Sequence, residues 1–219
     1  MGQGRLERVA PLAGALFTVV FAIGFLTSGD TPDTDAPGEE VISHYSDSGK
    51  IYFAIFALLL GAVLFMFFAG VLRGALAASS GAPEWLATVV FGGAVIYAVA
   101  LAIFAMSQVM LLDASDLGQP QVAQALNIFD NDNFFPAVLG LATILLATGW
   151  HALRSAVLPR WLAWAAVVLG VLAMAGPAGI AAFLLFPIWV LAVSLVLYQR
   201  AGGAGVVAPA AVVESSKLS

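Results

Sequence analysis

Six long apolar runs follow one another along the chain, and they strongly limit its possible folds. They cover about residues 9–27, 51–72, 85–112, 134–153, 161–175 and 180–198. A helix that spans the hydrocarbon core of a bilayer needs about 20 apolar residues. Hydrophobic residues make up 62% of the 219 and charged residues only 10%, too few to coat a water-soluble domain of this size. The sequence therefore predicts an all-α membrane protein with six transmembrane helices in one domain, residues 1–200, followed by a disordered cytoplasmic tail, residues 201–219.

The basic residues indicate how the helices are oriented. The stretch 152–163 (ALRSAVLPRWLA) joins two apolar runs and has the composition of a tight cytoplasmic turn. When the loops are assigned alternately to two sides, only Lys50 falls on one side, while the other side collects Arg5, Arg8, Arg73, Arg154, Arg160, Arg200 and Lys217. Cytoplasmic loops carry the excess of Lys and Arg. We therefore expect a cell-membrane protein with cytoplasmic termini, three in–out–in hairpins and two acidic outer loops, residues 28–50 and 113–133.

Two features of this arrangement leave alternatives open. The basic N-terminus before residues 9–27 also resembles a signal peptide, but the long run without a small-residue cleavage site favours a retained helix. The pattern L-R-small-A, a linker and P-x-W-L-A occurs at 72–87 and again at 153–163. It indicates either a duplicated hairpin, as in many transporters, or independent use of residues common at helix ends.

Both outer loops contain a short amphipathic segment. In residues 39–46 (EEVISHYS), the side formed by Val41, Ile42 and Tyr45 is expected on the membrane interface or on the top of the bundle. In the second loop, Val122, Leu126 and Phe129 follow the spacing i, i+4, i+7 of a helix.

Three segments resemble a group of uncharacterised bacterial membrane proteins that is common in actinobacteria. They are HYSDSG at 44–49, FFAGVLR at 67–73 and RSAVLPRWLAW at 154–164. The family is catalogued as a domain of unknown function, and the resemblance covers most of residues 9–200. It implies a six-helix bundle in the cell membrane. No activity is established for the family, so the resemblance implies no catalytic or binding residue.

One trio of residues has the composition of a metal site. Glu40, His44 and Asp47 are spaced i, i+4, i+7 and share one face of a continuous helix. Carboxylate and imidazole groups bind zinc and other divalent metals. The alternative is a solvated acidic loop, which Gly49 favours because it weakens a continuous helix. A metal site, or pH sensing by His44, is thus a hypothesis.

Other chemistry is sparsely represented. No Asp, Glu, Lys or Arg lies inside the six runs, which argues against a proton-coupled pump. Polar residues there are expected to pack between helices, and His151 is expected at the interface near a helix C-terminus. Cysteine is absent and the net charge is −5, so disulfides are excluded and nucleic acid is not an expected partner. No motif for a cofactor is found, and no cofactor is expected.

These observations favour a non-enzymatic accessory or regulatory membrane subunit in contact with the lipid bilayer. Small residues would allow a protein partner or a second copy to approach closely, at the pairs Gly70/Gly74, Gly92/Gly93 and Ala166/Gly170. The alternative is a small-solute or lipid transporter without a charge relay, indicated by the repeat and by the break between Gly176 and Pro187. A metalloenzyme using Glu40, His44 and Asp47 is a third hypothesis.

Overall fold

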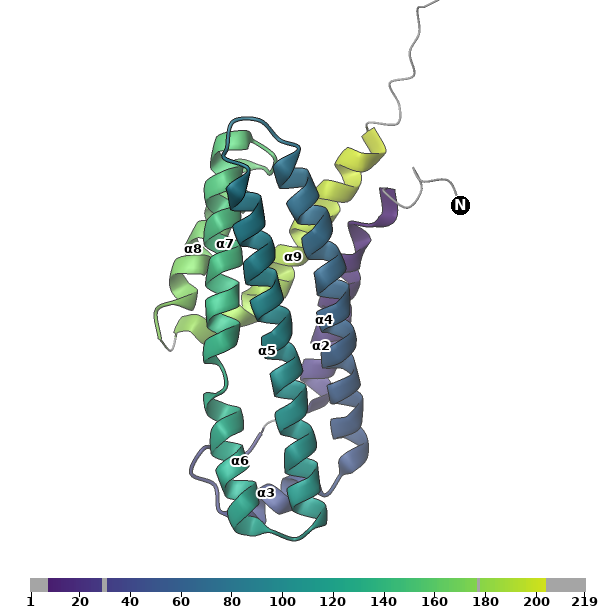
Figure 1. Ribbon diagram of the computed structural model, residues 1–219. Coiled ribbons are helices and arrows are strands. Elements are labelled where there is room, and N and C mark those ends of the chain that lie inside the picture. The colour runs from purple at the N-terminus through teal and green to yellow at the C-terminus, as the bar shows by residue number, and fades with distance from the viewer. Residues whose placement is uncertain (1–7, 29–30, 177, 204–219) are drawn as a thin grey trace, which may run out of the picture.

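The structure is a computed structural model, and it describes residues 8–28, 31–176 and 178–203. Every regular element in these residues is a helix. Along the chain they are α2 (Leu12–Ser28), α3 (Gly38–Tyr45), α4 (Ser48–Ala77), α5 (Trp85–Asp116), α6 (Pro120–Asp132), α7 (Phe135–Ser155), α8 (Arg160–Ala173) and α9 (Ala178–Gly203). The six apolar helices form a bundle, and α3 and α6 lie together at its lower end in Figure 1, away from the start of α2 and the end of α9. We call α3 and α6 the cap.

The helices differ in whether they are long enough to cross a bilayer. By length and composition, four stretches of the described chain can cross: Gly49–Ala77, Trp85–Asp116, Pro120–Ser155 and Ala178–Ala201. At a rise of 1.5 Å per residue, α2 and α8 reach only about 26 and 21 Å, against a hydrocarbon core of about 30 Å. The expected membrane protein is confirmed in this coarser form, with two of the six expected spans shorter than average.

Several expected boundaries differ from the observed ones. The first helix is expected from residue 9, but α2 begins at Leu12. The third is expected to end at 112, but α5 continues to Asp116. The last is expected to end at 198, but α9 continues to Gly203, so the first residues of the expected tail 201–219 are helical. The rest of that tail, like residues 1–7, lies outside the described residues.

The six bundle helices form a closed ring of neighbours. Each helix packs against the next: α2 on α4, α4 on α5, α5 on α7, α7 on α8, and α8 on α9. The ring closes because α9 packs against α2. Aromatic side chains fill the space that the six helices enclose. The ring centroid of Phe65 lies 5.1 Å from that of Phe17 and 5.2 Å from that of Tyr97. An apolar core of this kind is what helices with little polar surface build when they pack on one another.

Glycine permits a close backbone contact between α5 and α7. A Cβ atom on Gly140 of α7 would lie 2.6 Å from the backbone nitrogen of Tyr97 and 2.9 Å from the carbonyl oxygen of Gly93, both in α5. A small residue at this position therefore lets two backbones meet, as is common between membrane helices.

The loops at the end opposite the cap meet one another. Gly81, with φ at +97°, places the α4–α5 loop against the carbonyl oxygen of Arg154. Ala156, in the left-handed region at φ 54°, ends α7. The guanidinium of Arg200 donates a hydrogen bond to the carbonyl oxygen of Val157. Arg154 and Arg200 thus lie near one another at the end of the bundle where α4 leads into α5.

The cap has an apolar core of its own. Val41 and Tyr45 of α3 are fully buried beside Leu111 of α5 and Ala123 of α6. This cluster is distinct from the bundle core around Phe65. The expected amphipathic helix in the first loop therefore packs on the end of the bundle, the lower end in Figure 1. This was one of its two expected positions.

Candidate functional site

Helix α6 buries its polar side. The expected helix is present, but Val122 and Phe129 are 45% and 46% exposed, whereas Ala123, Asn127 and Asp130 are buried. Of the apolar stripe that defined the helix in the sequence, only Leu126 packs on the cap core, and the buried face also carries Asn127 and Asp130. Because buried polar groups are nearly always hydrogen-bonded, the partners of Asn127 and Asp130 show what the cap is attached to.

The carboxyl group of Asp130 is bound by two residues of α5. Ser107 Oγ donates to one carboxyl oxygen, and Gln108 Nε2 donates to the other at 2.9 Å. Asp130 is only 9% exposed. In the described residues the one ion pair is Lys50–Asp47, so hydrogen bonds, not a cation, satisfy the Asp130 carboxyl group. Such bonds are strong when an ionised acceptor takes part.

Further hydrogen bonds fasten the remaining parts of the cap. The side-chain amide of Asn127 donates to the carbonyl oxygen of Asp33 at 2.8 Å, and Asn131 donates to that of Pro32 at 3.3 Å. Ser115 Oγ of α5 donates to the carbonyl oxygen of Ile42 in α3 at 2.9 Å. The polar side of α6 thus holds the α2–α3 connection, and α5 holds α3.

Tyr45 completes the polar cluster from the side of α3. Its side chain is 1% exposed, and its hydroxyl group has no hydrogen-bond partner among the described residues. Burial raises the pKa of the Tyr45 phenol, and the negative charge of the Asp130 carboxylate raises this pKa further. The phenol therefore stays neutral and can act as a hydrogen-bond donor.

An apolar cavity of about 190 Å³ adjoins this cluster, among α2, α4, α5 and α9. Most of its wall is aromatic or aliphatic, and its polar side chains are Thr31 and Gln108. The lining residues are Phe21, Gly24, Phe25, Thr31, Ala54, Leu58, Leu101, Phe104, Gln108, Phe134 and Phe183. Gln108 therefore connects the cavity wall to the buried Asp130 carboxyl group.

The crossing of α2 and α9 explains why space remains there. Thr18 Oγ1 of α2 donates to the carbonyl oxygen of Pro187 in α9 at 2.8 Å. From this crossing α9 runs obliquely away from α2 toward the end that carries the cap (Figure 1). Phe25 of α2 lines the cavity and is 53% exposed. The cavity wall thus reaches the surface at two exposed lining residues, the apolar Phe25 and the polar Thr31.

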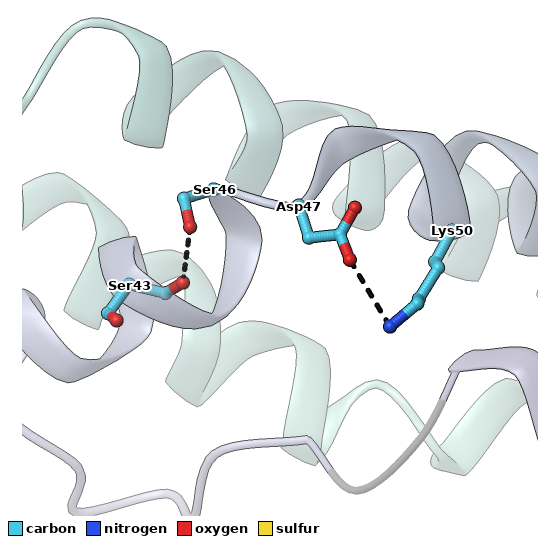
Figure 2. A network of polar contacts seen from close by, with 4 residues as sticks. All are labelled: Ser43, Ser46, Asp47 and Lys50. Carbon is cyan, nitrogen blue, oxygen red and sulfur yellow. Dashed lines mark hydrogen bonds and ion pairs between the residues drawn. The ribbon is translucent and has the colours of Figure 1, made fainter.

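The expected metal-ligand set is not assembled. α3 ends at Tyr45, Ser46 Oγ turns back to the Ser43 carbonyl oxygen at 2.7 Å, and a new helix follows (Figure 2). The prediction of a continuous helix that aligns Glu40, His44 and Asp47 is therefore wrong. The Asp47 carboxylate instead lies 3.2 Å from Lys50 Nζ, in an exposed pair. Glu40 and His44 line a polar surface depression with Asp33, and within the described residues no three acidic or histidine side chains are placed to hold a metal ion.

His151 lies near the C-terminal end of α7, as expected. Its side chain is fully buried in α7, and Nδ1 lies 3.1 Å from Ser155 Oγ. Its Nε2 atom has no partner among the described residues. Nothing in the sequence indicates this burial. Trp150, next to His151, and Arg154, one turn further along α7, are both exposed.

Comparisons with known proteins do not add a family. No family model, no curated protein and no solved structure matches the chain. The resemblance to uncharacterised bacterial membrane proteins therefore stays a prediction. Function has to be inferred from the cavity, the cap and the outer surface of the bundle.

Proposed function

We propose that this membrane protein binds a small apolar molecule, taken from the bilayer, in the cavity that adjoins the cap. The observation that carries the proposal is the cavity itself, with its aromatic wall, its exposed lining residue Phe25 and Gln108 on its wall. Ligand sites in proteins are typically concave and mostly apolar, with a few placed polar groups. This function belongs to the class of solute or lipid transporters and carriers.

The size of the cavity limits what can enter. An engineered apolar cavity of about 150 Å³ in another protein stays dry and binds benzene. A cavity of about 190 Å³ therefore suits a ring-sized group or the end of a short chain, not a whole phospholipid. The lining residues include no titratable side chain, so the proposed function is binding or transfer without a chemical step.

A second candidate function is that of an accessory subunit, and the outer face of α4 and α5 supports it. A Cβ atom on Gly70, Gly74 or Gly92 would meet nothing within 4 Å, so these glycines serve no packing inside the bundle. An apolar groove of about 500 Å³ lies between the same two helices, lined by Ala62, Val63, Met66, Phe67, Val95, Ala98, Val99 and Ala102. Small residues on an exposed face allow another membrane helix to approach closely.

One experiment separates the two functions. We expect mass spectrometry of the protein, extracted from its own membranes in native lipid discs, to find one recurrent small molecule at fixed stoichiometry. Ala54→Leu, which fills the cavity, should remove that molecule, whereas Ala102→Leu on the outer groove should retain it. A second protein at fixed stoichiometry, with no small molecule, would contradict the first function and favour the subunit.

We also propose that all six bundle helices cross the cell membrane and that the arginine-rich end is cytoplasmic. The excess of basic residues at that end supports this orientation. The bilayer would thin around α2 and α8, which mismatched helices can induce at modest cost. The cap, with its many acids, would then face away from the cytoplasm.

Single cysteines test this orientation cleanly, because the chain contains none. In intact cells, a membrane-impermeant maleimide should label Asp35→Cys and Ala175→Cys but not Ser80→Cys. Ser80→Cys should react only after the cells are opened. All three positions are exposed, so burial does not limit the reaction. Labelling of Ser80→Cys in intact cells would reverse the proposed orientation, and an unreactive Ala175→Cys would contradict a full crossing by α8.

A further inference from the structure

We infer that Asp130 is a proton-binding site and that the bound proton helps to keep the cap attached to α5. The carboxyl group holds this proton at a pH at which exposed Asp and Glu side chains are ionised. The proton is a ligand distinct from the molecule proposed for the cavity, and its site does not depend on the proposed function. It follows from the burial of Asp130, from the charges around it and from the number of hydrogen atoms available at Ser107.

The hydroxyl group of Ser107 touches two oxygen atoms but carries one hydrogen. Ser107 is fully buried, and its Oγ atom lies 2.8 Å from the carbonyl oxygen of Phe104 and in hydrogen-bond contact with Oδ1 of Asp130. A carbonyl oxygen has no hydrogen to donate, and neither has an ionised carboxylate. When Asp130 is ionised, one hydrogen therefore has to serve two acceptors. When Asp130 is protonated, each contact has a hydrogen of its own.

The neutral acid uses every hydrogen-bonding atom at this site. Its Oδ1–H donates to Ser107 Oγ, and the Ser107 hydroxyl then donates to the Phe104 carbonyl oxygen. The other carboxyl oxygen, Oδ2, still accepts from Gln108 Nε2 at 2.9 Å. A protonated carboxyl group has one donor and keeps acceptor capacity, which is what these neighbours require. Proton uptake thus keeps both hydrogen bonds between α6 and α5.

Burial without a cation favours the neutral form. Asp130 is 9% exposed, and the one ion pair in the described residues, Lys50–Asp47, does not include it. A buried carboxylate without a counter-ion is costly, so such a group takes up a proton. Burial raises the pKa of the Asp130 carboxyl group, and the hydrogen bonds from Ser107 and Gln108, which lower this pKa, are the smaller effect.

The helices around Asp130 bring no lysine or arginine to the site. α6 packs on α3 and α5, and none of these three helices contains a basic residue other than His44. His44 lines the surface depression with Glu40. From α3, Tyr45 faces Asp130, and its phenol is neutral because its pKa is raised. The other ionisable side chains near the cap, such as the exposed Asp132, are acids, whose negative charge also favours a neutral Asp130.

The proton stabilises the attached cap over a defined pH range. When the cap opens, Asp130 enters water, where an aspartic acid titrates at about pH 3.9. Between this value and the higher pKa of the closed state, the closed cap binds more protons than the open cap. The free energy of opening therefore falls as the pH rises through this range. One pH unit increases the open population by up to about tenfold.

Hydrogen exchange of the cap as a function of pH tests this proton site. The protein in lipid discs is exchanged at pH values from about 5 to 8, above the range in which exposed acids titrate. The rates in α3 and α6 are divided by the intrinsic rates of the same peptides. We expect the resulting open fraction to rise with pH, by up to about tenfold per unit, until the pKa of the closed state is passed. An open fraction that stays constant or falls would overturn the role of the proton.

A matched pair of variants assigns the pH dependence to one carboxyl group. Asp130→Asn imitates the neutral acid, because Nδ2 can donate to Ser107 Oγ while Oδ1 accepts from Gln108. Exchange in its cap should be slow and independent of pH. Asp132→Asn removes an exposed acid of the same helix and should keep the wild-type pH dependence. A dependence that survives Asp130→Asn, or that disappears in Asp132→Asn, would exclude Asp130 as the proton site.

Infrared spectroscopy detects the proton directly and needs only the wild-type protein. A protonated carboxyl group has a C=O stretching band that a carboxylate lacks. At about pH 6, exposed Asp and Glu side chains are almost wholly ionised, so a remaining band belongs to a buried acid. We expect this band in the wild type and in Asp132→Asn, and we expect Asp130→Asn to lack it. Its absence from the wild type would overturn the proton site, even if Asp130→Asn failed to fold.

Discussion

Gly140→Ala is expected to lower the melting temperature of the protein by several degrees. The new methyl group would lie 2.6 Å from the Tyr97 backbone nitrogen and 2.9 Å from the Gly93 carbonyl oxygen. Both atoms belong to the backbone of α5, so they cannot move aside without separating α5 from α7. Overpacking of this kind costs about 1–3 kcal/mol, and each kcal/mol lowers the melting temperature of a chain of 150–250 residues by about 2–4 °C.

Gly92→Ala is the matched control. Gly92 is also within a bundle helix, but a Cβ atom there meets nothing within 4 Å. Alanine has a higher helix propensity than glycine by about 1 kcal/mol, so this variant should melt at the wild-type temperature or slightly above it. Equal melting of Gly140→Ala and Gly92→Ala in detergent would show that α5 and α7 are not in close backbone contact.

The second large effect is expected at Asp130. Asp130→Ala leaves one amide hydrogen of the half-buried Gln108 side chain without its acceptor, while the Ser107 hydroxyl keeps the Phe104 carbonyl oxygen as an acceptor. An unsatisfied buried polar group costs about 1–3 kcal/mol, and this cost falls on the attachment of α6 to α5. We expect the cap to open locally more often, because local opening is governed by the contacts of the segment concerned. Amide hydrogen exchange in α6 and α3 should become at least about tenfold faster, the equivalent of ~1.4 kcal/mol.

The control for this prediction lies two residues further along the same helix. Asp132 is exposed, and Asp132→Ala removes the same carboxyl group without leaving a buried donor. Hydrogen exchange in the cap should then stay at the wild-type rate. If Asp132→Ala accelerated exchange as much as Asp130→Ala did, the net charge of the cap, not the bonds to α5, would hold it in place.

The bundle could be predicted from the sequence because a long apolar run without charges is typical of a membrane-spanning helix. The runs at 51–72 and 180–198 correspond to α4 and α9 within a few residues. The helix ends were less predictable, since α9 continues through residues that have no strong apolar pattern. The number of membrane crossings was also less certain, because α8 has only 14 residues and sequence hydropathy does not set helix length.

The candidate site could not be predicted, because its parts lie far apart in the sequence. Asp130 belonged to a polar loop, and Ser107 and Gln108 belonged to the end of an apolar run. Their association depends on α6 turning its polar side inward, which reverses the usual relation between hydrophobicity and burial. Periodicity detects a helix but not the donors that another helix offers to it. The prediction that Asp47 shares one helix face with Glu40 and His44 was wrong for a local reason. The turn at Ser46 ends α3 before Asp47 is reached.

The contact between α2 and α9 also bears on how the protein is made. A ribosome delivers α2 first and α9 last, yet Thr18 of α2 hydrogen-bonds to Pro187 of α9, and Phe183 supplies part of the cavity wall. A nascent chain therefore cannot close the ring, or complete the cavity, before α9 has been synthesised. A product that stops before α9 would lack Phe183 of the cavity wall and the hydrogen-bond acceptor of Thr18. The fold thus makes the formation of the cavity wait for the synthesis of α9.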